Sequence, residues 1–206
     1  TSIGFGAFQY CTSFTSITIP DSVTSIGRVA FTDCTSLKSV TIGNGVTSIG
    51  SDAFDNTEYY NNESNWENGV FYIGKYLIKA KDSISGSYAV KVGTRLIAEE
   101  AFSGCANLTS ITIPDSVTSI GDYAFEDCTS LTSIAIPDSV TSIGYSVFKN
   151  CRNFTSITIP DGVTSIGDRA FYACTSLTNI TIPDVVTSIG FGAFYACNSL
   201  ISITIP

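Results

Sequence analysis

Seven cysteines stand at one repeated position of the chain: Cys11, Cys34, Cys105, Cys128, Cys151, Cys174 and Cys197. Cysteines can hold a metal or form a disulfide framework, but both uses need clustered spacings such as C-x-x-C. Here the spacing is 23 residues, apart from one longer interval. Neighbouring Cα atoms one layer apart, about 4.8 Å, are within disulfide range, yet parallel side chains disfavour the roughly 90° torsion of a bridge. The spacing therefore predicts a ladder of free, buried thiols.

A second regular set is the aspartate that follows a strand proline: Asp21, Asp115, Asp138, Asp161 and Asp184. Carboxylates stacked one layer apart repel each other, and a cation such as Ca²⁺ could relieve that repulsion. The alternative is a row of solvated Pro-Asp turns in which each carboxylate accepts a local backbone N–H. Calcium needs six or more converging oxygens and a single row offers few, so the pattern favours turns.

The chain has no histidine, which removes the usual general base and the commonest metal ligand. Serines and aspartates repeat as rows, whereas an active site needs one singular arrangement of unlike groups. We therefore predict no enzyme, and no catalytic, cofactor-binding or metal-binding residues. The net charge of −8 argues against nucleic acid as a partner. No apolar run approaches the roughly 18 residues that cross a bilayer, so membrane insertion by this segment is not expected.

These positions belong to a 23-residue unit that recurs along nearly the whole chain. Its phenylalanine returns at Phe8, Phe31, Phe54, Phe102, Phe125, Phe148, Phe171 and Phe194. Every step is 23 residues except the step from Phe54 to Phe102, which is 48, or two periods plus 2. Such a period is typical of a solenoid, in which each unit buries its apolar side against its neighbours. Apolar residues make up 44% of the chain, enough for a continuous core.

The unit that begins at Leu108 shows how one coil is expected to fold. Ile111 and Ile113 alternate with polar residues, which predicts a strand with both isoleucines inward. Pro114 ends that strand because it has no N–H for the next ladder bond. A second short extended piece covers residues 117–120, and Gly121 permits a tight bend.

The rest of the unit, Asp122 to Cys128, places Ala124, Phe125 and Cys128 inward at helical spacing, which predicts a single helical or 3₁₀ turn. The predicted fold class is therefore an α/β repeat solenoid, rich in β-structure, with parallel strands on one side and short helical or 3₁₀ turns on the other. The Leu, Ile, Ile, Val, Ile, Ala and Phe positions form seven internal ladders.

The recurrent pattern L-x-x-I-x-I-P-x-x-V-x-x-I-G-x-x-A-F-x-x-C resembles the leucine-rich repeat, and more closely its BspA-like (Treponema pallidum-type) subclass. It can be read from Leu37 to Phe54, with Gly43 in place of Pro, and again from Leu108 through Cys197. The resemblance implies a right-handed superhelix. It also implies a surface-exposed or secreted protein that adheres to host proteins or to other cells.

One solenoid domain is expected over residues 1–206, with regular repeats at 1–54 and 99–206 and an irregular insert at 55–98. The chain contains no Met, and neither end looks like a polar cap, so we expect it to be part of a longer protein.

The insert contains two short apolar runs that turn at Gly74 and Lys75, a candidate for a hairpin. One interpretation is that the insert, which holds the only tryptophan, Trp66, forms a binding protrusion. The other is a variant repeat pair in which Trp66, Phe71 and Leu77 fill the core, as apolar runs of this kind usually do.

Two outward rows of hydroxyls are nearly invariant: strand positions such as Ser110 and Thr112, and the Thr-Ser pair before each Ile-Gly, such as Thr118 and Ser119. Hydroxyl arrays on parallel strands resemble those of ice-binding solenoids, so an ice- or mineral-binding array is one alternative function. Against it, Ser alternates with Thr, and a curved sheet matches a flat lattice poorly. β-Branched Thr also suits the exposed face of any strand.

Variation gathers at the positions that flank the Ala-Phe pair of each unit, and these carry much of the tyrosine and charge. Tyrosine gives a large contact area at low entropic cost, so these positions could form a protein-binding surface. The alternative is that they are the ordinary solvent-exposed residues of the turns. Together with Trp66 of the insert, the candidate interaction residues are Tyr10, Tyr123, Tyr145, Arg169, Tyr172, Phe191 and Tyr195. We predict a non-enzymatic extracellular or cell-surface module for protein recognition or adhesion, with the ice- or mineral-binding array and a purely structural spacer as alternatives.

Overall fold

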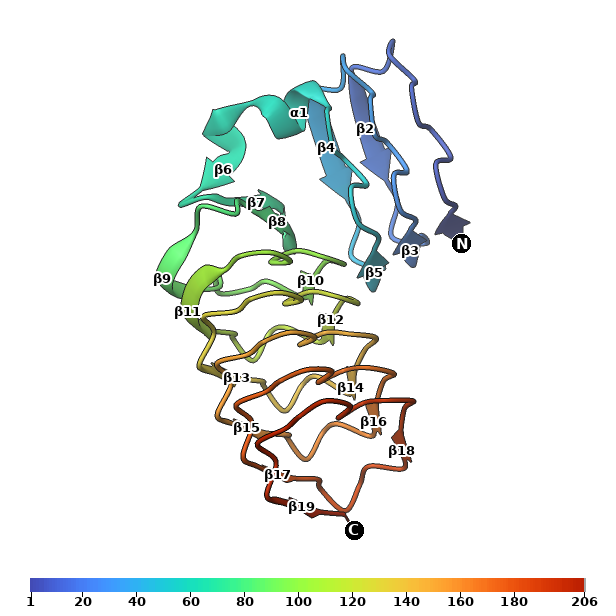
Figure 1. The fold of residues 1–206 in the computed structure, drawn as a ribbon. Coiled ribbons are helices and arrows are strands. Elements are labelled where there is room, and N and C mark those ends of the chain that lie inside the picture. The colour runs from blue at the N-terminus through green and yellow to red at the C-terminus, as the bar shows by residue number, and fades with distance from the viewer. Residues whose placement is uncertain (206) are drawn as a thin grey trace.

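The protein is a stack of coils, each with two short strands and one turn, as the computed structural model of residues 1–205 shows (Figure 1). The longer strands form one row: β2 Ser16–Ile19, β4 Ser39–Ile42, β9 Ser85–Ala89, β11 Asn107–Thr112, β13 Ser133–Ala135, β15 Ser156–Thr158, β17 Asn179–Thr181 and β19 Ser202–Thr204. The two-residue strands form the other: β1 Ser2–Ile3, β3 Ser25–Ile26, β5 Ser48–Ile49, β10 Leu96–Ile97, β12 Ser119–Ile120, β14 Ser142–Ile143, β16 Ser165–Ile166 and β18 Ser188–Ile189.

The strands of each row form short parallel sheets, β1-β3-β5, β10-β12 and β14-β16-β18 in one row and β2-β4, β9-β11-β13 and β15-β17-β19 in the other, in which a strand pairs with its equivalent in the adjacent coil. In the short-strand row Ile3 pairs with Ile26 and Ile26 with Ile49, and in the long-strand row Ile157 pairs with Ile180. A slip of one residue would turn each inward isoleucine to solvent, so the apolar alternation fixes the 23-residue register.

The inward positions predicted from the sequence are confirmed. In the unit that begins at Leu108, the side chains of Leu108, Val117, Ala124 and Phe125 are fully buried, and its three isoleucines are no more than 8% exposed. The phenylalanine rings of adjacent coils stack almost parallel, with centroids from 5.2 Å to 5.6 Å apart. The core therefore consists of ladders that are continuous within each half of the stack, from Phe8 to Phe54 and from Phe102 to Phe194.

The prediction of helical turns, and with it the α/β class, was wrong. In the turn after Gly121, Tyr123, Phe125 and Asp127 each donate their N–H to a carbonyl of the next coil, at 2.9 Å, while the amides between them donate three residues back. Tyr123 and Asp127 also have a φ of 57°, in the left-handed region that a right-handed helix excludes. Since alternate amides bond to the neighbouring coil, the turn behaves as a ladder and the protein is a β-solenoid.

Glycine is required at position 121 for a reason other than the predicted tight bend. Its φ lies outside the left-handed region, but a Cβ added there would lie 2.4 Å from the backbone N of Glu99 in the preceding coil. The equivalent Gly50 would meet the backbone N of Arg28, also at 2.4 Å. At both positions the absence of a Cβ lets successive coils approach closely, and the same holds at Gly27, Gly167 and Gly190.

The insert contains the helices of the described chain: α1 Glu58–Asn61 and one 3₁₀ turn over Glu63–Asn65. Strands β6 Trp66–Glu67, β7 Val70–Ile73 and β8 Tyr76–Ala80 follow and pair antiparallel. β7 and β8 form a hairpin that turns at Gly74 and Lys75. β8 then pairs parallel with β10, which joins the hairpin to the short-strand row.

The hairpin separates two hydrophobic cores. One of its faces, which includes Phe71 and Tyr76, packs on the core of the N-terminal coils, and the opposite face, with Val70 and Leu77, packs on the core of the C-terminal coils. A strand that is covered on both faces has a nearly continuous run of apolar residues, as β7 and β8 do. The strands before and after the insert run in different directions in Figure 1, so the stack bends at the hairpin.

Candidate functional site

The outward residues of the turns form a surface that we call the turn face. It is made by the six-residue turns that follow each Gly of the short-strand row, and in the last four coils these turns cover residues 122–127, 145–150, 168–173 and 191–196. The third and fourth residues of each turn point into the core, as Ala124 and Phe125 do. Because the backbone amides are bonded to the next coil, the other side chains can vary without altering the coil.

Six of the predicted interaction residues come together on the turn face. Tyr123 meets Tyr145 edge to face with ring centroids 5.0 Å apart, and Arg169 Nη1 donates a hydrogen bond to the Tyr145 hydroxyl at 2.8 Å. Tyr172 stacks on Tyr195 at 5.0 Å. With Phe191, these residues make a surface across four successive coils, which we call the aromatic strip: Tyr123, Tyr145, Arg169, Tyr172, Phe191 and Tyr195.

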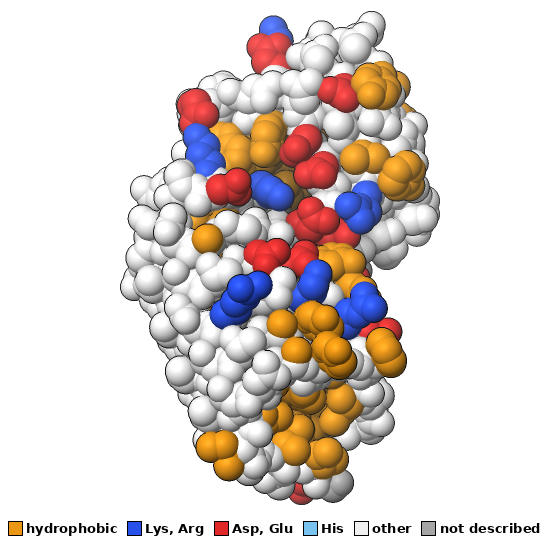
Figure 2. All heavy atoms as spheres, in the orientation of Figure 1, with side chains coloured by type: hydrophobic (Ala, Val, Ile, Leu, Met, Phe, Trp, Pro, Cys, Tyr) orange, Lys and Arg blue, Asp and Glu red, His pale blue; other side chains and the backbone are white. Residues whose placement is uncertain are grey.

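The strip is exposed at its C-terminal end, at Arg169, Phe191 and Tyr195, and half-buried at Tyr123, Tyr145 and Tyr172. Phe191 is 75% exposed and Tyr195 62%. Figure 2 shows apolar side chains gathered over the C-terminal coils, below a group of Lys and Arg side chains. Desolvation, together with a side-chain hydrogen bond to Tyr145 that favours the neutral hydroxyl of Tyr123, raises the pKa of Tyr123 to about 12.

Polar residues of the same turns hold the strip in place. Asp122 Oδ1 accepts the N–H of Tyr145, and Asp168 Oδ1 accepts that of Phe191, both at 2.7 Å. Lys149 Nζ lies 2.6 Å from Glu126 Oε1, and this hydrogen bond raises the pKa of Lys149. These contacts join successive coils and fix the spacing of the aromatic rings.

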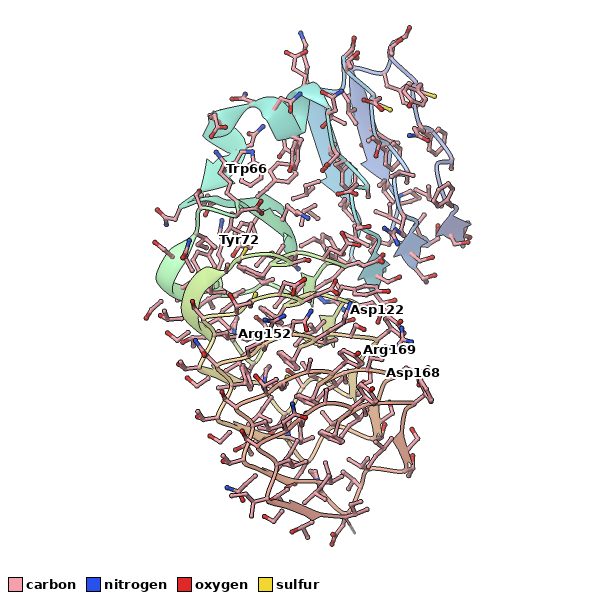
Figure 3. The ribbon with its side chains drawn as sticks, viewed as in Figure 1. Trp66, Tyr72, Asp122, Arg152, Asp168 and Arg169 are labelled. Atoms are coloured by element: carbon pink, nitrogen blue, oxygen red, sulfur yellow. The ribbon has the colours of Figure 1, made fainter. Side chains whose placement is uncertain are left out.

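The other two predicted residues lie elsewhere. Tyr10 is 67% exposed in the first coil, at the opposite end of the stack. Trp66 lies on the insert, away from Arg169 and Asp168 (Figure 3). It is half-buried, donates its Nε1–H to the Tyr60 carbonyl at 2.7 Å and packs beside Phe71.

The remaining insert residues favour the core-filling interpretation. Phe71 and Leu77 are fully buried, and Lys81 Nζ lies over the Trp66 ring, 5.0 Å from its centroid. The indole is therefore contacted within the chain by Lys81, Phe71 and Tyr60.

The cysteine ladder is buried as predicted. Six cysteines are buried, Cys11 is half-buried, and all seven are free. Each of the four thiols from Cys128 to Cys197 donates to the phenylalanine carbonyl of the preceding coil at 3.1 Å. Burial raises the pKa of Cys105 to about 12, and it raises the pKa of the other buried thiols as well. These groups are poor nucleophiles because the thiolate is the reactive form.

We therefore expect one fast-reacting thiol in the folded protein. At pH 8, an aromatic disulfide reagent is expected to modify Cys11 and to leave the six buried thiols unreacted. All seven are expected to react after denaturation in urea. A Cys11→Ser variant is the control, and rapid reaction of that folded variant would contradict the buried ladder.

The Pro-Asp positions form turns. Val117 donates its N–H to the Pro114 carbonyl at 3.0 Å, and the same bond recurs at each later proline of this row. Asp115 and its equivalents are exposed. Asp21 Oδ1 accepts an N–H at 2.7 Å, but from Asn44 of the next coil rather than from its own turn. Among residues 1–205, no three His, Cys, Asp or Glu side chains are grouped as metal ligands.

Part of the hydroxyl array is used inside the molecule. Thr118 Oγ1 donates to the Arg95 carbonyl at 3.3 Å, and Thr164 Oγ1 donates to the Thr141 carbonyl at the same distance. On the long-strand row, Ser110 and Ser87 join their hydroxyls at 2.8 Å. These contacts link one coil to the next.

Asp55, at the start of the insert, is a half-buried carboxyl that the sequence did not single out. Desolvation raises its pKa from 3.8 to about 6, with the neighbouring Asp52 and Asp33 carboxylates adding to the effect and Lys79 opposing it. Between those two values the folded protein holds a proton that the unfolded chain releases. Stability contributed by this group is therefore lost as the pH rises through that window.

Asp55→Asn is accordingly expected to raise the melting temperature at pH 8 and to give a smaller gain at pH 4. Thermal melts of both proteins at the two pH values measure the difference. Asp115→Asn, at an exposed turn, controls for the loss of one charge. An equal gain from Asp55→Asn at both pH values would contradict the desolvation of Asp55.

A cavity of about 210 Å³ at the end of the aromatic strip was missed by the sequence reasoning. It is lined by Arg169, Tyr172, Phe191, Gly192 and Tyr195. The nearest signal in the sequence was Gly192, which stands in the row where preceding coils have Tyr123, Ser146 and Arg169. Gly6 occupies the same row in the first coil, so glycine alone does not predict the cavity; it depends on the rings of the adjacent coils, which only the stacking reveals.

Among residues 1–205, no helix is long and apolar enough to cross a membrane.

Comparisons with known proteins identify the family of the chain and solved structures with the same fold. The model of the family described as "BspA type Leucine rich repeat region (6 copies)" matches residues 1–88 and 95–206. A leucine-rich cell surface protein from Faecalibacterium prausnitzii is 32% identical, with a TM-score of 0.67; the alignment covers 97% of this chain and 62% of that one. This chain thus spans less than two thirds of that protein's length. No curated protein matches the chain.

Two further solved structures share the fold at lower identity. A leucine-rich repeat protein from Bacteroides ovatus is 24% identical over 98% of this chain and 82% of that one, with a TM-score of 0.50. The pneumococcal vaccine antigen PcpA is 20% identical over 98% of this chain and 59% of that one, with a TM-score of 0.57. With the repeat matched along almost all of its length, this chain belongs to the BspA-type leucine-rich repeat family.

Proposed function

We propose that this protein is a non-enzymatic recognition module at a bacterial cell surface, and that the aromatic strip is the surface that contacts a protein partner. Leucine-rich repeat families are generally recognition scaffolds. The solved relative with the highest identity of those described above is a cell surface protein, which supports the same location for this chain.

The observation that carries the proposal is the continuity of the strip. Five aromatic rings and one guanidinium span four coils, at positions that the core leaves free. Tyrosine and arginine are enriched in the central contacts of protein interfaces. A rigid array of rings also loses little conformational entropy on binding.

The purely structural spacer and the ice- or mineral-binding array are less well supported. A spacer does not need exposed rings such as Phe191 and Tyr195, which an aqueous surface disfavours. For an ice-binding array, the regular hydroxyls would have to face solvent freely, whereas several of them bond to the preceding coil.

The test is a triple variant with Tyr123, Tyr172 and Tyr195 changed to Ala. Wild-type protein immobilised on beads is exposed to solubilised surface proteins of host cells and of bacteria, and any retained protein is purified and its affinity measured. The triple variant is expected to bind that partner at least about tenfold more weakly, because each ring removes central contact area. Unchanged affinity, in a variant with an unchanged melting temperature, would contradict the proposal.

A further inference from the structure

The cavity at the end of the aromatic strip has the dimensions of a site for one side chain. Its volume of about 210 Å³ is below the roughly 300–1,000 Å³ of pockets that hold small-molecule ligands. Gly192, which has a φ of 62° and no side chain, lines it together with the rings of Tyr172, Phe191 and Tyr195. The lining is mostly apolar, so the cavity suits an apolar occupant.

The exposed rings around this cavity belong to the turn face rather than to an uncovered core. Phe191 and Tyr195 occupy the positions held in an inner coil by Tyr145 and Lys149, which are also turned outward and are half-exposed. Core positions of the same coil are different residues, such as Ala193, which is 3% exposed. The cavity is therefore part of the turn face.

Arg169 gives the cavity a positive edge. Its Nη1 donates to the neutral hydroxyl of Tyr145, and none of the six ion pairs described within residues 1–205 includes it. The carboxylate next to it in the chain, Asp168, is already bonded to the N–H of Phe191. An exposed guanidinium beside an apolar cavity complements a carboxylate that lies beside an apolar group.

We propose that this cavity receives one aromatic side chain of a protein partner, and that Arg169 pairs with a carboxylate in the same segment of that partner. The inference rests on the proposed function of the aromatic strip and specifies what it recognises: an acidic segment with an aromatic residue. The ring packs between Tyr172, Tyr195 and Phe191, where offset and edge-to-face contacts are available. The guanidinium and the carboxylate then set its orientation.

A small probe that carries both groups tests the inference without the partner. 3-Phenylpropionate joins a phenyl ring to a carboxylate, and 3-phenylpropanol is its uncharged counterpart. Each is titrated into uniformly ¹⁵N-labelled protein, and the amide signals of Gly192 and Ala193 are followed by NMR. The amide of Gly6, next to the exposed Phe5, is the internal control, because the arginine of the adjacent coil, Arg28, is already paired with Glu99 and Glu100.

The acid is expected to shift the Gly192 and Ala193 signals with an affinity about fivefold above that of the alcohol, the preference that an exposed ion pair can give. In Arg169→Gln the two probes are expected to bind equally, and in Tyr195→Ala neither is expected to bind. The amide of Gly6 should not move.

Two results would overturn the inference. In one, neither probe moves the Gly192 and Ala193 signals. In the other, the acid and the alcohol bind alike in wild type and in Arg169→Gln. Because no partner is used, either result leaves recognition by the wider strip to be decided by the triple tyrosine variant.

Discussion

Phe125→Ala is expected to lower the free energy of unfolding by about 3–5 kcal/mol, as large-to-small changes in a packed core do. The ring of Phe125 is fully buried and stacks on Phe102 at 5.3 Å and on Phe148 at 5.6 Å. Its loss would leave a cavity in the middle of the ladder. The neighbouring coils cannot collapse into that cavity without breaking their backbone hydrogen bonds.

Phe194→Ala is the matched control, because this ring has the same position in the unit but stacks on one neighbour, Phe171, and is half-buried. We expect it to lose about half as much stability, since it gives up about half of the buried contact area. Urea denaturation monitored by circular dichroism measures both variants. A loss below about 1 kcal/mol for Phe125→Ala would be incompatible with the ladder.

Gly121→Ala is expected to destabilise the protein by about 2–3 kcal/mol, although the substitution adds one methyl group. The new Cβ would lie 2.4 Å from the backbone N of Glu99, so the two coils would have to separate. Separation weakens the ladder bonds on both sides, including that from the Gly121 N–H to the Ile97 carbonyl at 2.8 Å.

Gly4→Ala isolates this effect. Gly4 stands at the same point of the first coil, and a Cβ added there has no atom within 4 Å. The substitution is therefore expected to leave stability unchanged or to raise it slightly by restricting the unfolded chain. Equal losses for Gly4→Ala and Gly121→Ala in the same urea melts would show that the backbone conformation, not the approach of the coils, requires glycine.

The repeat made most of the fold predictable from the sequence. The inward residues, the parallel register and the buried thiols all follow from a 23-residue period with apolar positions in phase. The shape of the turns did not follow. Ala124, Phe125 and Cys128 have helical spacing, but the N–H groups of Tyr123, Phe125 and Asp127 find acceptors in the next coil, and a single unit contains no sign of that competition.

The site was predictable as a set of positions but not as a surface. The repeat shows that Tyr123, Tyr172 and Tyr195 are free from the core, but the contact between Arg169 and Tyr145 depends on the lateral spacing of coils. The cavity beside Gly192 was not predicted for the same reason. Tyr10 was predicted from its position in the unit, but it lies in the first coil, away from the strip. Trp66 was predicted as part of a protruding insert, but it packs beside Phe71.

The most direct test of the proposed function compares two faces of the same solenoid against one purified partner. One variant changes Tyr123, Tyr172 and Tyr195 to Ala on the turn face, and the other changes the exposed Thr112, Thr158 and Thr181 to Ala on the long-strand row. Calorimetric titration is expected to show at least about a tenfold loss of affinity for the first and less than about a twofold loss for the second. The reverse order would place recognition on the strands and contradict the assignment of the aromatic strip.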